Sequence, residues 1–125
     1  MCRQIRIAPR NSLILVSDSR DAEMPPSMLG GLIAATSSCI AIGTLCEHDG
    51  ETLISLGDED SAVTDGQSLV FDGVLDTPNR TVTVWSVLGD PILSIDVTAE
   101  KTQVRVWANH HSEPDAIRIH VSAIP

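Results

Sequence analysis

Apolar and polar residues alternate along most of this chain, in short runs bounded by glycine, proline or acidic residues. Alternation with a period of two places one face of a strand in a core and the other in solvent, so each run predicts a half-buried β-strand. The clearest runs are residues 4–8, 67–75, 81–88, 92–97, 102–108 and 116–123. Residues 12–16 are continuously apolar, which is typical of a strand covered on both faces.

The stretch 39–58 predicts a β-hairpin. Two partly alternating runs, 39–47 and 51–56, flank Asp49-Gly50, a dipeptide that readily adopts the positive φ angles of a type I′ turn. Residues 4–8 and 12–16 are expected to be neighbouring strands, and 81–88 is expected to pair with 92–97. Segments 18–26 and 57–66 are rich in charge and in turn-forming residues, and are expected to be loops.

These runs predict an all-β protein with roughly eight to ten short strands at the spacing typical of a sandwich. The fold class that we expect is a single-domain antiparallel β-sandwich, jelly-roll-like, over residues 1–125. The chain has two Trp, one Phe and no Tyr, so Val, Ile and Leu must fill its core. Branched aliphatic side chains also favour strands over helices.

Charge narrows the classes of partner. The formal net charge is −9, from 17 acidic and 8 basic residues. Such a surface repels phosphate backbones and acidic membranes, so direct binding of nucleic acid or of a membrane is not expected. A basic protein partner would be attracted instead. Acidity also keeps ordinary domains in solution, so charge alone does not require a partner.

Cysteine usage predicts a cytoplasmic protein with reduced thiols. Cys2, Cys39 and Cys46 are odd in number and lack a CxxC spacing, and the first residues contain no apolar leader. No apolar run approaches the length of a membrane span.

No catalytic motif, phosphate-binding glycine loop or metal-ligand pattern is found, so we expect neither an enzyme nor a cofactor. His110 and His111 are adjacent, so their side chains diverge, and a solvated loop is favoured over a metal site. Cys46 and His48 would share one face of a strand, but their side chains would not reach hydrogen-bond distance, so a catalytic Cys–His dyad is not expected. Trp85 and Trp107 could serve as platforms for a glycan, but a structural role is favoured for both.

The densest acidic cluster follows the predicted hairpin. It does not match the spacing of an EF-hand, so a solvated acidic loop that suits a basic partner is the favoured interpretation, with a looser calcium site left open. The cluster comprises Asp58, Glu59, Asp60 and Asp65.

The hairpin region resembles the central block of the competence protein J group, whose members are small β-sandwich nuclease inhibitors. The resemblance lies in Ile42-Gly43-Thr44-Leu45, in Glu47 and Gly50, and in Leu56-Gly57-Asp58. The order of charged loop, hairpin, acidic loop and strand meander also agrees, whereas the low aromatic content departs from the group. The resemblance assigns no functional residue by position.

The resemblance and the charge together suggest an inhibitor or immunity-type protein that blocks a basic, nuclease-like partner. Carboxylates would occupy the places where nucleic-acid phosphates normally sit. The expected partner-binding residues are Asp58, Glu59, Asp60 and Asp65, helped by Asp18, Asp21 and Glu23. One alternative is a structural or self-assembling β module that forms a homo-oligomer, and a third is a sandwich that binds a small ligand, a glycan or calcium.

Overall fold

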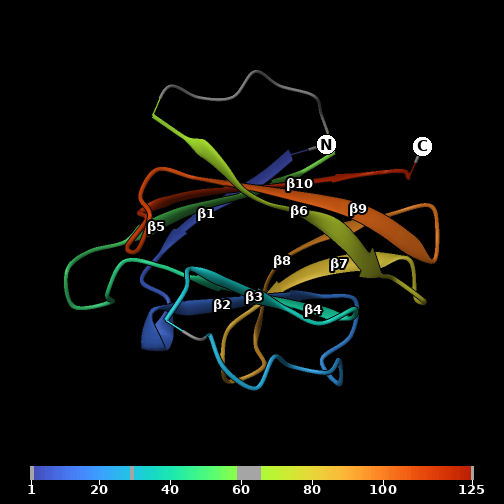
Figure 1. The fold of residues 1–125 in the computed structure, drawn as a ribbon, viewed down its shortest axis with the longest axis horizontal. Coiled ribbons are helices and arrows are strands. Elements are labelled where there is room, and N and C mark those ends of the chain that lie inside the picture. The colour runs from blue at the N-terminus through green and yellow to red at the C-terminus, as the bar shows by residue number, and fades with distance from the viewer. Residues whose placement is uncertain (1, 29, 59–65, 125) are drawn as a thin grey trace.

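Two five-stranded sheets packed face to face form the protein (Figure 1). The structure is a computed structural model, and it describes residues 2–28, 30–58 and 66–124. Sheet A has the order β1 (Cys2–Ile7), β5 (Thr52–Gly57), β10 (Ala116–Ser122), β9 (Lys101–Ala108) and β6 (Ser68–Asp76). Sheet B has the order β3 (Ile33–Ala35), β4 (Cys39–Gly43), β2 (Leu13–Ser17), β7 (Thr81–Trp85) and β8 (Pro91–Asp96). The predicted β-sandwich is therefore confirmed.

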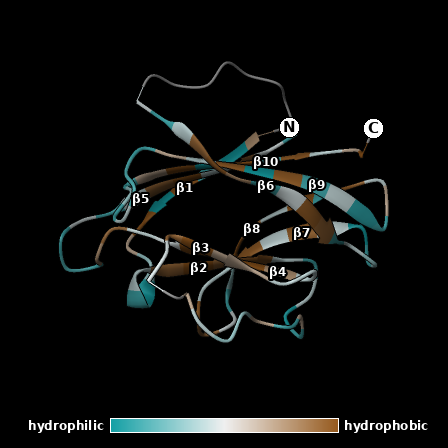
Figure 2. Ribbon diagram, in the orientation of Figure 1, coloured by the Kyte–Doolittle hydropathy of each residue, from teal (hydrophilic) through white to brown (hydrophobic). Residues whose placement is uncertain are grey.

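The core lies between the two sheets and is built from branched aliphatic side chains. Alternate residues of each strand point into it, as in β9, where Val104 and Val106 are buried and Gln103 and Arg105 are partly exposed. Figure 2 shows hydrophobic residues concentrated in the strands and hydrophilic ones in the connecting loops. The buried cluster comprises Ile14, Val16, Ile40, Ile42, Ile54, Leu56, Leu75, Val82, Val84, Ile95, Val104, Val106, Ile117, Ile119 and Val121.

The described strands pair antiparallel with one exception. In sheet A, β10 pairs antiparallel with β9 on one side and parallel with β5 on the other, where Ile117 lies beside Ile54 and Ile119 beside Leu56. This register keeps the apolar faces of both strands toward sheet B, because the inward-facing residues of one strand lie beside the inward-facing residues of the other. The sandwich is therefore mostly, but not wholly, antiparallel.

The predicted hairpin over residues 39–58 is wrong. β4 lies between β3 and β2 in sheet B, whereas β5 lies between β1 and β10 in sheet A, so the two strands belong to different layers. The amide of Asp49 donates to the carbonyl of Cys46 at 2.9 Å, which closes a turn, and Gly50 follows it with φ of 146°. Residues 44–51 instead cross between sheets that lie about 10 Å apart, a distance that a two-residue turn cannot span.

The pairing of residues 4–8 with 12–16 is also wrong, because β1 pairs with β5 while β2 pairs with β4 and β7. Between them a single 3-10 turn, η1 (Arg10–Ser12), redirects the chain from sheet A to sheet B, with Asn11 and Ser12 at positive φ. The predicted pairing of 81–88 with 92–97 is confirmed, since β7 and β8 are antiparallel neighbours. No helix among the described residues is long and apolar enough to span a membrane.

Adjacent residues of β6 provide a test of the layered core. Leu75 is fully buried and Val74 is 48% exposed. Truncating a buried leucine removes transfer energy and leaves a cavity, so Leu75→Ala is expected to lower the free energy of unfolding by about 2–5 kcal/mol. Val74→Ala is expected to cost less than about 1 kcal/mol. Urea denaturation measures both, and equal losses would contradict the placement of Leu75 in the core.

Candidate functional site

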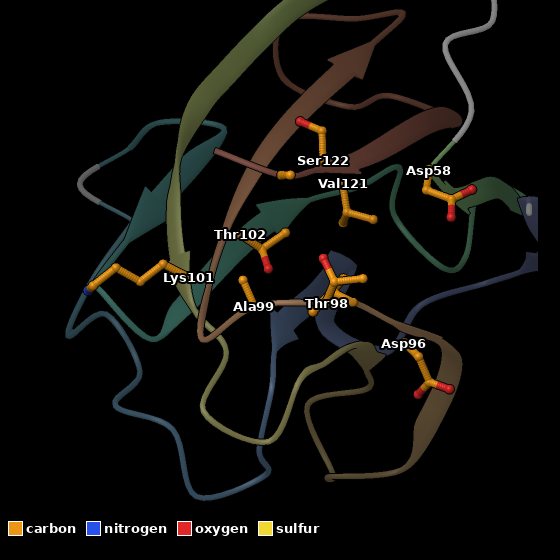
Figure 3. A pocket seen from close by; sticks show the side chains of 10 residues that line it. Asp58, Asp96, Thr98, Ala99, Lys101, Thr102, Val121 and Ser122 are labelled. Carbon is orange, nitrogen blue, oxygen red and sulfur yellow. The ribbon is translucent and has the colours of Figure 1, made fainter. Parts of the chain in front are cut away.

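Asp58 directly follows β5 and lines a hollow of about 250 Å³. Asp96, the last residue of β8 in the opposite sheet, lines the same hollow. Figure 3 shows the two side chains at one end of the hollow, one from each sheet. Both residues are exposed and also line an adjoining, larger hollow of about 510 Å³ with Arg3. The fold thus joins Asp58 to a carboxylate that lies far from it in the sequence.

The rest of the first hollow is apolar or neutral apart from Lys101. Val97, Ala99, Val121 and Ala123 provide its apolar surface. Lys101 lies at the other end, and its ammonium points away from Asp58 and Asp96 (Figure 3). A hollow with apolar walls and two carboxylates at one end suits a Lys or Arg side chain, whose aliphatic stem and charged head need different surroundings.

An ion pair with Asp76 holds the ammonium of Lys101 away from Asp58 and Asp96 (Figure 3). The nitrogen Nζ lies 2.7 Å from Oδ1 of Asp76. This hydrogen bond is the main cause that lowers the pKa of Asp76 below its ordinary value of 3.8, and the attraction between the two charges adds to it. Both side chains are partly exposed, so the pair contributes little to stability.

The Lys101–Asp76 pair predicts a local change in pKa. Lys101→Gln is expected to raise the pKa of Asp76 toward 3.8, because the charged donor is lost. The native pKa lies below that of the unfolded chain, so the stabilisation by the pair is present above the unfolded pKa and is lost as the pH falls through the native one. NMR titration of the carboxyl carbons measures this. Asp72, whose pKa is lowered by Gln103 and Arg105, is the internal control and should keep its value.

Three of the predicted partner-binding residues, Glu59, Asp60 and Asp65, lie outside the described residues. Glu59 and Asp60 come directly after Asp58 in the sequence, and Asp65 lies a few residues further on. Their place in a binding surface stays a prediction.

Asp18 is buried, with 6% of its surface exposed. Its Oδ2 accepts hydrogen bonds from the amides of Asn79, at 2.8 Å, and Thr81, at 3.5 Å, and its Oδ1 accepts one from Nδ2 of Asn79 at 2.7 Å. The carboxylate therefore ties the end of β2 to the turn before β7. Because these donors occupy the carboxylate, Asp18 is not available to bind a partner protein.

Asp21 and Glu23 are exposed, but they lie in the loop that follows β2. Figure 1 shows this loop on the side of sheet B that faces away from sheet A. Asp58 instead continues a strand of sheet A. The structure thus does not bring these two residues together with Asp58.

Two variants compare the contributions to stability of the buried Asp18 and the exposed Asp21. Asp18→Ala leaves two amides and a side-chain NH₂ without their acceptor, so the free energy of unfolding is expected to fall by about 2–3 kcal/mol. Asp21→Ala removes the same charge from an exposed side chain and is expected to change it by less than about 0.5 kcal/mol. Chemical denaturation of both proteins decides this, and a mild effect of Asp18→Ala would argue against a structural role.

Sequence reasoning missed a second acidic region. The amide of Leu45 donates to the carbonyl of Pro114 at 2.9 Å, and the amide of Leu53 donates to the carbonyl of Asp115 at 2.8 Å. These bonds join the link between β4 and β5, and the start of β5, to the loop between β9 and β10. The acidic loop end, as we call it, comprises Glu47, Asp49, Glu51, Glu113 and Asp115. Its two halves are far apart in sequence, and no local pattern indicates that they meet.

The histidines in this region have structural contacts. The expectation that the side chains of His110 and His111 diverge is wrong, because the two rings stack with centroids 4.5 Å apart. Nδ1 of His110 accepts hydrogen bonds from the amides of Ser112 and Glu113. In the part of the chain that the structure describes, no three side chains of His, Cys, Asp or Glu gather as metal ligands.

Both tryptophans are half-buried and lie beside arginines. The guanidinium of Arg118 lies 5.3 Å from the ring centre of Trp107, and that of Arg20 lies 6.0 Å from the ring centre of Trp85. Trp107 also contacts the buried ring of His120 edge to face. These contacts favour the structural interpretation of both rings over an open glycan platform.

The architecture defines the class of protein as a β-sandwich of two five-stranded sheets that contain one parallel pair among the described strands. No protein-family model and no curated protein matches the sequence.

Among solved structures, the fold is similar to that of ComJ from Bacillus subtilis, described as an inhibitor of the DNA-degrading activity of NucA. The TM-score is 0.71 over 98% of this chain and 96% of ComJ, and the sequence identity is 14%. The resemblance inferred from the sequence is therefore confirmed in the fold.

Proposed function

We propose that this protein inhibits a nuclease by binding to it. The observation that carries the proposal is the likeness to ComJ, which extends over 98% of the chain rather than over an isolated motif. The net charge of −9 supports the same role, because a nuclease that holds DNA presents cationic groups. An inhibitor of this kind blocks its target by contact and needs no catalytic group of its own.

The proposed contact surface is centred on Asp58 and Asp96, with Glu59, Asp60 and Asp65 as further members. The two carboxylates at the hollow, backed by Val97 and Val121, suit a Lys or Arg side chain of the nuclease. The ammonium of Lys101 is held by Asp76 at the other end of the hollow (Figure 3). Charge of this sign also speeds encounter with a cationic protein, most strongly at low salt.

Capture from a lysate of the organism that encodes the chain tests the proposal. The immobilised protein is expected to retain a DNA-degrading activity at low salt and to release it at high salt, because screening weakens attraction between exposed charges. The free protein, added in excess, is expected to slow DNA degradation by the released fraction. If the protein neither retains a nuclease nor slows one, the proposed function is wrong.

Matched double variants test the surface separately. Asp58→Asn with Asp96→Asn, and Asp49→Asn with Glu113→Gln at the acidic loop end, each remove two negative charges. The first pair is expected to weaken binding to the captured nuclease at least about tenfold and to reduce its salt dependence. The second pair is expected to weaken it by less than about threefold, through the loss of long-range attraction alone. The reverse order would place the binding surface at the acidic loop end, while leaving inhibition itself intact.

A further inference from the structure

The loop after β2 forms a small second core on the outer face of sheet B. Leu15, Cys39 and Ala41 are buried on this face, and Ala22 and Met28 of the loop pack against them. The backbone of Glu23 is fixed to the turn between β3 and β4, since its amide donates to Oγ of Ser38 at 3.0 Å. Its carbonyl accepts a hydrogen bond from Oγ1 of Thr36 at 2.6 Å. The loop is therefore held at a defined position over the sheet.

A cavity of about 200 Å³ lies between this loop and the turn that joins β7 to β8. Its walls are mainly apolar, and the indole of Trp85 is held in place by a hydrogen bond from Nε1 to the carbonyl of Ser17 at 3.4 Å. Burial raises the pKa of the Cys39 thiol to about 11, so this wall is uncharged at neutral pH. The apolar lining comprises Leu15, Ala22, Met24, Cys39, Trp85, Val87 and Leu88. A cavity of about 150 Å³ with such walls is large enough for benzene.

Arg20 is the cationic residue in the lining of this cavity. Its guanidinium lies 6.0 Å from the ring centre of Trp85, and its side chain passes close to Gly89. A Cβ at Gly89 would lie 3.3 Å from Nε of Arg20, so glycine at this position gives the arginine room. No carboxylate of the described residues forms an ion pair with Arg20.

We propose that this cavity binds a small aromatic carboxylate, with the ring against Trp85 and the carboxylate on Arg20. The volume limits the ligand to a single ring with a short acidic arm. Apolar walls provide most of the affinity, and one charge-assisted hydrogen-bond donor at the rim selects an anion over a neutral analogue. The site uses neither Asp58 nor Asp96, so it does not depend on the proposed nuclease inhibition.

The fluorescence of Trp85 provides the readout. The chain has two tryptophans, so Trp107→Phe leaves Trp85 as the single reporter. Phenylacetate is expected to change its emission saturably in the millimolar range, and neutral phenylacetamide is expected to bind at least about tenfold more weakly. In a protein that carries Trp85→Phe instead, the remaining Trp107 is expected to show no saturable change.

Two further variants, made in the Trp107→Phe protein, test which groups of the cavity bind phenylacetate. Arg20→Gln alters an exposed side chain and is expected to weaken the binding of phenylacetate by about tenfold or more. The affinity for phenylacetamide is expected to change by less than about twofold. Ala22→Leu is expected to fill the cavity and to abolish binding of both compounds, with an unchanged melting temperature showing that the fold persists. The proposal is overturned if phenylacetate gives no saturable signal, or if the signal survives Arg20→Gln unchanged.

Discussion

The apolar layer between the two sheets is the constraint on which the rest of the structure depends. Each strand contributes every second side chain to it, and these side chains are almost all Val, Ile or Leu. Aliphatic burial is non-directional, so it determines which face of a strand points inward but not which strand lies beside which. Strand partners then follow from how the chain can cross between layers. The parallel pair of β5 and β10 meets the same constraint as the antiparallel pairs, because its register keeps the inward faces of both strands together.

The candidate sites lie where this layer ends or where its outer surface is covered. The hollow that is lined by Asp58 and Asp96 lies at the ends of β5 and β8. The cavity beside Trp85 lies outside sheet B, beneath a loop that hydrogen bonds hold in place. Buried residues such as Val121 and Leu15 contribute apolar surface to these sites, whereas the charged groups lie in loops and at strand ends.

Carboxylates of similar appearance in the sequence have different roles in the fold. Asp18 is buried and accepts three hydrogen bonds, Asp76 pairs with Lys101, and Asp58 lines a hollow. An isolated charge in a loop indicates exposure on average, but hydrogen-bond donors from a distant turn convert one such residue into a structural tie. For this reason, the net charge alone does not identify which carboxylates are exposed.

Alternation of apolar residues by itself determined the fold class and the inward residues of strands such as β9 and β10, because the period of two in a strand is a local property. The pairing of 81–88 with 92–97 was also predictable, since a short turn joins them. Only the tertiary structure decided that 39–43 and 52–57 belong to different sheets, and that Asp58 lies near Asp96. Such choices depend on contacts between residues far apart in the chain, where burial of a shared core outweighs the preference of a single turn.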